Sequence, residues 1–377
     1  MKVAICGYPP LALQVQDALQ NSGIEFKSFI EDFVSTRGGE GEDLFTNLPL
    51  INFFEFRRLV NTGELDGIII AENRRSPFTK EIVSLLKLYK IPQVGIMDFM
   101  WINPVCTLYW LDPYKIFLPY LEADITDVCN LRCRGCYHFA NFSYSEDIYP
   151  LENYRRDMSQ IAKTCDVPVF RLLGGEPLVM KNFDEYMNIA RQYFPKSALE
   201  FVTNGLLIPS ASKKIFDSIR KNKFVVSVSV YPPTEKILDK IKAVLDEKGI
   251  PYRFSKPVEN FLARMTLSGD HDPLKTRRIC SSDVCRSMLN GRIYKCPIDE
   301  FSFKLAKKFG IENFPAATSV DIYAQNFSSL IKMLDGDIEL CHWCGDKHRQ
   351  VPWSRSDNPK LEDWLANPDE LKNFVGG

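Results

Sequence analysis

The sequence lacks the long apolar segments that direct a chain to a membrane or across it. No run in its 377 residues approaches the roughly 20 apolar residues that a membrane span needs. Near the N-terminus, only VAIC separates Lys2 from Gly7, which is too short for the apolar core of a signal peptide. The sequence therefore predicts a cytoplasmic protein, in which cysteines serve as metal ligands more often than they form disulfides.

A strong charge of either sign is also absent. Lysine and arginine number 47 and aspartate and glutamate number 48, so the formal net charge is -1. A surface so balanced has no field with which to recruit nucleic acid or a membrane, and neither is expected as a partner. The length of 377 residues and the hydrophobic content of 45% predict a globular chain of two or three domains that acts on a small molecule.

The N-terminal part, residues 1–112, is predicted to form a Rossmann-like domain that lacks a dinucleotide fingerprint. KVAIC and IEFKSF are typical strands around a helix over about 11–21, and GIIIA, a helix over 76–89 and PQVGIMDF repeat the pattern. No GxGxxG motif is present, and the prolines of the first turn, GYPPLA, offer no N–H groups to a pyrophosphate. A sugar-binding, partner-docking or purely structural role is left open for this domain.

Residues 113–275 alternate strands and helices again, which predicts a second parallel sheet and an α/β fold class. The expected strands cover 121–126, 167–174, 198–204, 224–230 and 252–256, and the expected helices cover 151–164, 182–193, 211–221 and 234–248. Because parallel strands bring their carboxyl ends to one edge, the residues that follow them are candidates for a functional site. Those residues are Asp127–Cys136, GGEP (174–177) and Asn204.

Three of the eleven cysteines fall in the stretch CNLRCRGC, at Cys129, Cys133 and Cys136. Three thiolates can ligate three irons of a cubane [4Fe–4S] cluster and leave the fourth iron open, as catalytic zinc sites leave one position open for a ligand. A zinc knuckle would pair CxxC units with further ligands, and His138 lies too close in sequence to supply one easily. Zinc and unrelated buried thiols are the alternatives to a cluster with an open iron.

The CxxxCxxC loop, followed by LLGGEPL at 172–178, resembles the core of the radical S-adenosylmethionine (SAM) superfamily. The resemblance implies a partial (β/α)6 barrel of the TIM type. In it, Cys129, Cys133 and Cys136 would ligate a [4Fe–4S] cluster whose open iron is chelated by SAM. An external electron donor such as a flavodoxin or ferredoxin would drive reductive cleavage of SAM to a 5′-deoxyadenosyl radical, which takes a hydrogen atom from a substrate.

The same resemblance implies which residues contact SAM. They are Tyr137, Gly174, Gly175, Glu176, Pro177, Asn204 and Ser229. Two glycines let backbone approach a ligand closely, and a carboxylate at Glu176 suits an ammonium donor, whereas Asn204 and Ser229 equally fit polar caps of strands. The family usually has an aromatic residue before the third cysteine. This chain has Gly135 there, and neighbouring Tyr137 is expected to take its place.

Five further cysteines lie in the C-terminal region, residues 276–377, at Cys280, Cys285, Cys296, Cys341 and Cys344. The elements GRIYKC and CHWC resemble the twitch or SPASM extension of radical SAM enzymes, which implies a second, auxiliary [4Fe–4S] cluster. Its expected ligands are Cys296, Cys341 and Cys344, completed by either Cys280 or Cys285. A set containing both of these with one cysteine of CHWC, and a structural zinc held by four thiolates, fit the same spacing.

The predicted substrate is small and polar. An N-terminal domain of βα type, rather than a winged helix, favours a sugar or nucleotide sugar that is dehydrogenated or epimerised. One alternative is a radical SAM maturase that modifies a peptide or protein. The other is a non-catalytic iron–sulfur protein that binds SAM without cleaving it.

Overall fold

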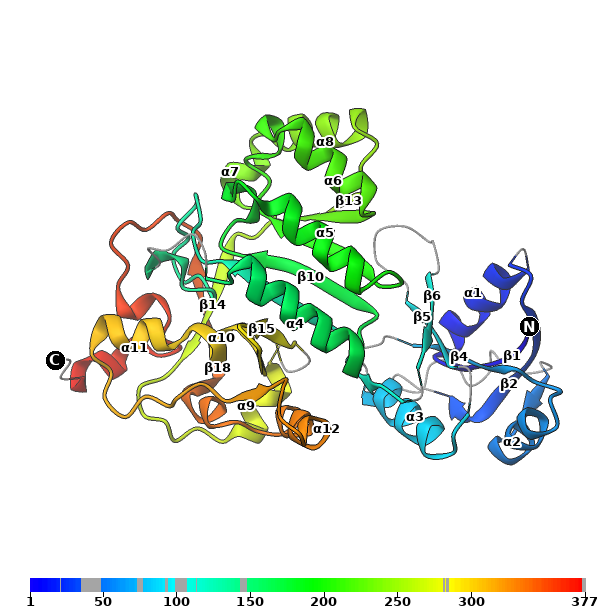
Figure 1. Cartoon of the computed structure of the whole chain (residues 1–377). Helices are drawn as coiled ribbons and strands as arrows, with labels where there is room; N and C mark the ends of the chain where they lie inside the picture. The colour runs from blue at the N-terminus through cyan, green and yellow to red at the C-terminus, as the bar shows by residue number, and fades with distance from the viewer. Residues whose placement is uncertain are drawn as a thin grey trace. The chain divides into compact units, whose positions relative to one another are not determined.

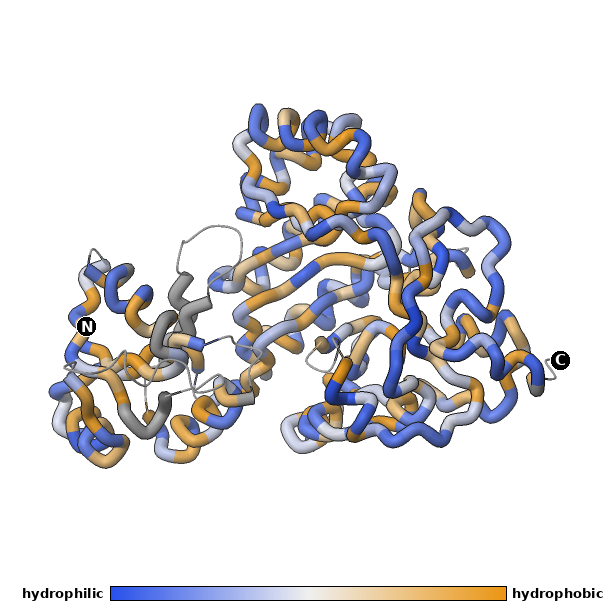
Figure 2. Tube along the Cα trace, turned by 180° about the vertical axis from the view of Figure 1, so that it is seen from behind, coloured by the Kyte–Doolittle hydropathy of each residue, from blue (hydrophilic) through white to orange (hydrophobic). Residues whose placement is uncertain are grey.

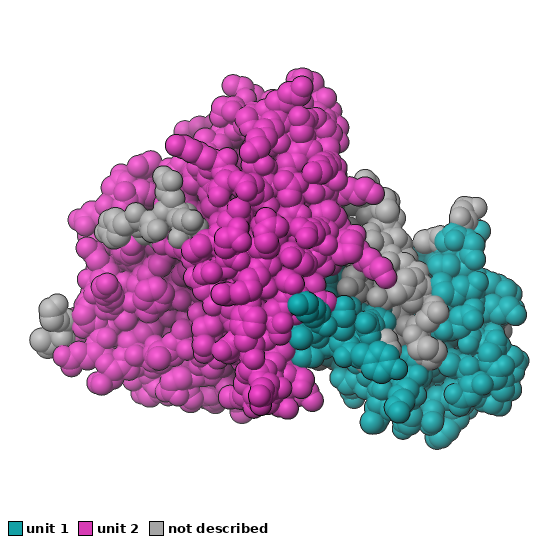
Figure 3. Space-filling view, in the orientation of Figure 1, with its two compact units in different colours: residues 1–119, 163–168 teal, residues 120–162, 169–377 magenta. Residues whose placement is uncertain are grey.

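The computed structural model describes residues 1–20, 22–34, 49–72, 77–91, 94–98, 107–112, 114–142, 148–280, 282 and 285–374. The chain forms two compact units, one of residues 1–119 and 163–168 and the other of residues 120–162 and 169–377 (Figure 3). Both are built from strands and helices in alternation, which confirms the predicted α/β class. The boundary predicted at residues 275 and 276 stays a prediction. In the part of the chain that is described, no helix has the length and apolar character needed to cross a membrane.

The smaller unit contains a six-stranded sheet of order β3-β2-β1-β4-β5-β6 (Figure 1). Its elements are β1 (Lys2–Gly7), α1 (Pro9–Leu19), β2 (Glu25–Val34), β3 (Leu50–Ile51), α2 (Phe53–Asn61), β4 (Gly67–Ala71), α3 (Pro77–Leu88), β5 (Val94–Asp98), β6 (Thr107–Leu111) and the short β7 (Ile116–Phe117). All neighbours in the sheet pair in parallel except β5 and β6. This is the strand order of a Rossmann sheet, as predicted.

Strand β4 shows why this sheet is covered on both faces. Its five residues, GIIIA, are all buried. Ile68 and Ile70 enter one apolar cluster while Ile69 and Ala71 enter another, because successive side chains of a strand point to opposite faces. The sequence did not predict β3, α2 or β6, and residues 21, 76, 92, 93 and 99 of the predicted elements lie outside the described residues.

The larger unit contains an eight-stranded sheet of order β13-β12-β11-β10-β8-β15-β16-β17 (Figure 1). Its strands are β8 (Leu121–Thr126), β10 (Val169–Gly174), β11 (Ala198–Thr203), β12 (Phe224–Val228), β13 (Tyr252–Phe254), β15 (Ser287–Leu289), β16 (Arg292–Tyr294) and β17 (Ser319–Asp321). Six neighbouring strands of this sheet pair in parallel, namely β13, β12, β11, β10, β8 and β15. The pairs β15–β16 and β16–β17 are antiparallel. The parallel strands thus have their carboxyl ends at one edge.

Amphipathic helices connect these strands. They are α4 (Leu151–Thr164), α5 (Phe183–Tyr193), α6 (Lys213–Lys221), α7 (Pro232–Glu235) and α8 (Leu238–Glu247). Helix α6 buries Phe216 and Ile219 and leaves its lysines exposed to solvent. Figure 2 shows apolar and polar residues alternating along the helices in this way. The predicted helices agree with α4, α5 and α6 within two residues, whereas the one predicted over 234–248 is divided into α7 and α8.

A two-stranded ribbon lies apart from the main sheet. Strand β14 (Asn260–Met265) pairs antiparallel with β18 (Cys344–Pro352), so segments far apart in sequence lie side by side. Between them in sequence come α9 (Pro273–Ile279), α10 (Pro297–Phe301), α11 (Phe303–Phe309) and α12 (Phe327–Leu330). The sequence predicted neither strand of this ribbon.

Gly174, at the end of β10, is required by close backbone packing. Its φ is +137°, and a Cβ atom there would lie 2.1 Å from the carbonyl oxygen of Thr126. Replacing Gly174 by alanine is therefore expected to destabilise the larger unit by about 3–5 kcal/mol, because strain and overlap with backbone add. Urea unfolding followed by circular dichroism measures this change.

Gly249 is the matched control for that substitution. It also has a positive φ, +62°, but nothing lies within 4 Å of its Cβ position. Gly249→Ala is expected to cost only about 1 kcal/mol, the price of the left-handed conformation alone. Equal losses for the two variants would contradict the argument from close packing.

Candidate functional site

The carboxyl ends of β8, β10, β11 and β12 are joined by hydrogen bonds at one edge of the sheet. The N–H of Gly175 donates to the carbonyl of Thr126 at 2.6 Å. The N–H of Asn204 donates to Oε2 of Glu176 at 2.8 Å, and the N–H of Ser229 donates to the carbonyl of Thr203 at 2.9 Å. The structure thus brings together GGEP, Asn204 and Ser229 at the edge where the cysteine-bearing loop begins.

That loop, Cys129–Cys136, is named the cysteine loop here. Its three cysteines fall within eight residues, and the chain turns at Arg132 and Gly135, which have φ values of +50° and +72°. A Cβ atom on Gly135 would lie 3.1 Å from the carbonyl oxygen of Asp363. Packing and backbone conformation therefore explain why glycine, and not an aromatic residue, precedes Cys136.

Donors surround the cysteine sulfurs. The N–H of Leu131 donates to Sγ of Cys129 at 3.5 Å, and Nε1 of Trp353 donates to Sγ of Cys133 at 3.1 Å. Sulfur that accepts such bonds is best stabilised as thiolate, the form that binds metal. The spacing of the cysteines gave no indication of Trp353, which lies 220 residues from Cys133 in sequence.

A C-terminal strap, residues 353–364, lies against the cysteine loop. The N–H of Arg134 donates to the carbonyl of Ser354 at 2.8 Å, and the N–H of Ser356 donates to the carbonyl of Arg132 at 2.9 Å. At the far end of the strap, Nε1 of Trp364 donates to the carbonyl of Cys136 at 2.9 Å. The strap therefore holds the backbone of the loop at three points.

The chemistry of these thiols suits a metal group. Burial raises the pKa of Cys129 to about 11 and raises the pKa of Cys133 and Cys136 as well, while the N–H donors act in the opposite direction. Buried thiols of this kind become thiolates when a metal replaces the proton. The charges of the three cysteines also interact with one another. The residues present therefore fit a cluster.

Glu176 is fully buried and braces the edge of the sheet. Its carboxylate accepts bonds from Oγ1 of Thr203 at 2.7 Å, from the N–H of Leu178 at 3.1 Å and from the N–H of Asn204 at 2.8 Å. Burial raises the pKa of Glu176 to about 7, against the opposite effect of these donors. Its neighbours Gly174 and Gly175 approach the backbone of Thr126, at the end of β8, and of Val128, just before the cysteine loop. The predicted contacts of these residues with SAM stay predictions.

The other predicted residues occupy distinct places. Nδ2 of Asn204 donates to Oδ1 of Asn130 at 2.7 Å, inside the cysteine loop. Pro177 is buried at the start of a short 3-10 helix (Pro177–Val179). The hydroxyl of Tyr137 donates to the carbonyl of Leu262 at 2.7 Å, which directs this ring toward β14. Its predicted contact with adenine is likewise untested.

Two ion pairs beside the cysteine loop were not predicted. Nδ1 of His138 lies 2.9 Å from Oδ1 of the fully buried Asp124, and Nζ of Lys304 lies 2.9 Å from Oδ2 of Asp127. Burial of His138 acts to lower its pKa, but the carboxylate of Asp124 outweighs burial, so the pKa of His138 is raised. Sequence spacing had no means of linking Lys304 to this loop, because 177 residues separate it from Asp127.

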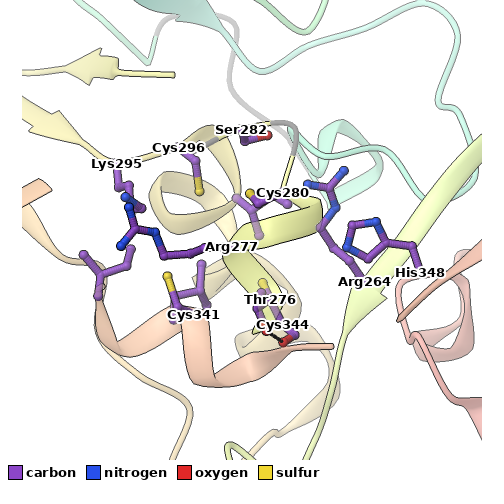
Figure 4. A pocket seen from close by; sticks show the side chains of 13 residues that line it. Arg264, Thr276, Arg277, Cys280, Ser282, Lys295, Cys296, Cys341, Cys344 and His348 are labelled. Carbon is purple, nitrogen blue, oxygen red and sulfur yellow. Dashed lines mark hydrogen bonds between the residues drawn. The ribbon is translucent and has the colours of Figure 1, made fainter. Parts of the chain in front are cut away.

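Four cysteines line a cavity in the C-terminal part of the larger unit, the four-thiol cavity (Figure 4). They are Cys280, Cys296, Cys341 and Cys344. Cys280 caps the end of α9, Cys296 precedes α10, and Cys344 begins β18. Cys285 is described but does not line this cavity. Cys280 thus lines this cavity and Cys285 does not, while the choice of cluster ligand between them stays a prediction.

Arginine, lysine and histidine side chains flank the four thiols. Arg264 and His348 lie on one side of the cavity and Lys295 and Arg277 on the other (Figure 4). Burial raises the pKa of Cys344 to about 12, and the charge of Arg264 acts to lower it. Among the described residues, no three His, Cys, Asp or Glu side chains lie close enough together to hold a single metal ion.

Residues 124–248 match the family described as the Radical SAM superfamily. The matched range contains the cysteine loop, GGEP and Asn204. This part of the chain therefore resembles a radical SAM domain. This superfamily consists of enzymes that use a [4Fe–4S] cluster and SAM, which are the two cofactors expected from the sequence.

Curated relatives share part of the chain. The GTP 3′,8-cyclase of Helicobacter pylori (strain HPAG1) is 32% identical over 107 residues, which cover 28% of this chain and 33% of the relative. The GTP 3′,8-cyclase of Campylobacter curvus (strain 525.92) is 29% identical over 151 residues, which cover 36% of this chain and 46% of the relative. The chain thus spans between a third and a half of the length of these relatives.

Solved structures are similar to part of this chain at low sequence identity. The crystal structure of BtrN with AdoMet and 2-DOIA is 17% identical, with a TM-score of 0.38, and the match covers 66% of this chain and 98% of BtrN. Streptococcus suis SuiB bound to its precursor peptide SuiA is 21% identical, with a TM-score of 0.31, and the match covers 37% and 32% of the two chains. With both TM-scores below 0.5, neither structure indicates the substrate of this chain.

Proposed function

We propose that this chain is a radical SAM enzyme that cleaves SAM reductively and takes a hydrogen atom from a small polar substrate. Cys129, Cys133 and Cys136 would hold a [4Fe–4S] cluster, whose fourth iron binds SAM. The observation that carries the proposal is the meeting of three thiols, that of Cys133 buried and those of Cys129 and Cys136 partly buried, with GGEP and Asn204 at one edge of a parallel sheet. When bound, the cluster supplies the electron that cleaves the sulfonium.

The protein's own residues prepare this site. Trp353 donates a hydrogen bond to one cysteine sulfur, and hydrogen bonds to sulfur help set the reduction potential of iron–sulfur clusters. Trp364 of the strap also donates a hydrogen bond to the carbonyl of Cys136, which helps to fix the position of the third cysteine. Glu176 fixes the turn that faces the loop, since three donors hold its carboxylate.

The four-thiol cavity is proposed to hold an auxiliary [4Fe–4S] cluster through Cys280, Cys296, Cys341 and Cys344. Four thiols around one cavity match the four protein ligands that such a cluster takes. A structural zinc is the competing occupant. Iron and sulfide analysis separates the two, since two cubanes require about eight irons per chain and one cubane with zinc requires about four.

The sheet interior supports a polar substrate. Nε of Arg171 on β10 and Nη2 of Arg253 on β13 each lie 2.6 Å from Oε2 of Glu200 on β11, and β12 separates β11 from β13 in the sheet. Both arginine side chains are partly exposed, at 20% and 23%, although they lie among parallel strands. Guanidinium groups suit phosphate, and the curated relatives are named for GTP. A nucleotide or nucleotide sugar, oxidised or epimerised, is the substrate class we propose.

Anaerobic incubation tests this function. Reconstituted protein, a chemical reductant and SAM are expected to yield 5′-deoxyadenosine at least about tenfold above a control without protein, a difference of about 1.4 kcal/mol in barrier. With deuterated GTP or nucleoside diphosphate sugars, deuterium should appear in that product. Deuterium from a peptide but from no nucleotide would indicate a maturase. No 5′-deoxyadenosine at all would indicate a protein that binds SAM without cleaving it.

A further inference from the structure

Arg264, on β14, is a buried cation that contacts Tyr137 and lines the four-thiol cavity. Only 3% of the residue is exposed. Its Cζ lies 4.5 Å above the ring centre of Tyr137, and its Nη2 donates to the hydroxyl of Tyr137 at 3.0 Å. Tyr137 directly follows Cys136 of the cysteine loop. A single side chain therefore separates the Arg264 guanidinium from a cysteine of the first site.

The same guanidinium lines the four-thiol cavity. Figure 4 shows Arg264 with the four cysteines around this space. The charge of Arg264 interacts with the thiols of Cys280 and Cys344. Burial lowers the pKa of His348, and the charge of Arg264 lowers it further. Buried charges are stable when they face opposite charge, which thiolates on a metal cluster would supply.

Tyr137 is held firmly at the other end of this contact. Its hydroxyl donates to the carbonyl of Leu262 and accepts from the N–H of Leu262 at 3.0 Å, in addition to the bond from Arg264. Its ring meets that of Phe261 edge to face, with centroids 5.9 Å apart. Arg264 on β14 and Tyr137 beside the cysteine loop thus form a fixed pair, and Arg264 also lines the four-thiol cavity.

We propose that Arg264 is a positioning residue that makes the occupant of the four-thiol cavity easier to reduce and ties that cavity to the cysteine loop through Tyr137. The inference rests on the proposed function. A [4Fe–4S] group held by four thiolates carries a net charge of about −2, and one further electron adds to it. A nearby buried cation stabilises the more negative state. An easily reduced group would accept the electron that a substrate radical must lose, with its proton released to water, so oxidation is favoured over epimerisation.

The test is a redox titration of both clusters in the full-length reconstituted protein, followed by electron paramagnetic resonance. Arg264→Met is expected to lower the ratio of reduced to oxidised auxiliary cluster at a fixed potential at least tenfold, which is 59 mV for one electron. Arg264→Lys keeps the charge and should restore the ratio to within about threefold of the unmodified protein.

Arg277→Met is the matched control. Arg277 lines the same cavity, but its Nη1 pairs with Oδ1 of Asp337 at 2.9 Å, so its removal should change the ratio less than about threefold. Should Arg264→Met lose its irons, Tyr137→Phe decides, because it removes only the hydroxyl that orients Arg264. That variant should still shift the ratio by about twofold or more.

The outcomes separate the inference from the function beneath it. Two titrating clusters in the unmodified protein, with unchanged ratios in Arg264→Met and Tyr137→Phe, would overturn the role of Arg264 while leaving the proposed function intact. A single titrating cluster and about four irons per chain would instead remove the auxiliary cluster itself. A fall in thermal stability with no change in ratio would show that Arg264 is a packing residue only.

Discussion

Replacing Cys133 by alanine is expected to reduce formation of 5′-deoxyadenosine from SAM to background, a loss of at least about 10³-fold or about 4 kcal/mol of barrier. Cys133 is 6% exposed, and its sulfur accepts the bond from Trp353. Without it the cysteine loop offers two thiols, which cannot hold three irons of a cubane. Liquid chromatography of the nucleoside product, after anaerobic reconstitution and reduction, measures the effect.

Cys165→Ala provides the control, because it removes a thiol of similar burial, 3% exposed, that lies outside both cysteine sites. The control should retain full activity and about eight irons per chain, whereas Cys133→Ala should retain about four. Activity of Cys133→Ala within tenfold of the unmodified protein would mean that the cysteine loop is not the site of SAM cleavage.

Exchanging Cys280 for alanine is expected to remove the auxiliary cluster, and exchanging Cys285 is expected to leave it in place. Both cysteines belong to the same short segment, but only Cys280 lines the four-thiol cavity. The iron content should therefore fall from about eight to about four per chain in Cys280→Ala and stay near eight in Cys285→Ala. Iron analysis with electron paramagnetic resonance of the reduced proteins measures both quantities.

The opposite pattern, with cluster loss in Cys285→Ala alone, would reverse this assignment. Loss in both variants would support the set in which Cys280 and Cys285 act together. A zinc content of about one per chain that disappears with Cys280→Ala would keep the cavity as a metal site and change only its occupant.

Local pattern was sufficient for the parallel sheet of the larger unit. LEADIT at 121–126 and the helix at 151–164 coincide with β8 and α4, because strand and helix periods are visible within ten or so residues. The ribbon of β14 and β18 was missed because its pairing joins Asn260 to Pro352, and no periodicity within either segment specifies such a partner. Strands of three residues, such as β15 and β16, are too short to show a period.

The candidate site divides in the same way. Cysteine spacing and GGEP were readable, because metal ligands of one loop are close in sequence. The residues that surround the cysteines could not be predicted from the sequence. Trp353 lies 220 residues from Cys133, and Arg264 lies 127 residues from Tyr137. Spacing could not separate Cys280 from Cys285 either, because the end of α9 decides which of them faces the cavity.

The long separation between the cysteine loop and the strap has a consequence for biosynthesis. Arg134 and Asp363 form an ion pair across 229 residues, so the loop leaves the ribosome well before its partner is translated. At about 5–20 residues per second, the delay is on the order of 10 to 45 s. During this interval the three thiols are uncovered in a nascent chain. Iron delivery that waits for the finished polypeptide would spare them from oxidation and from capture by competing metals.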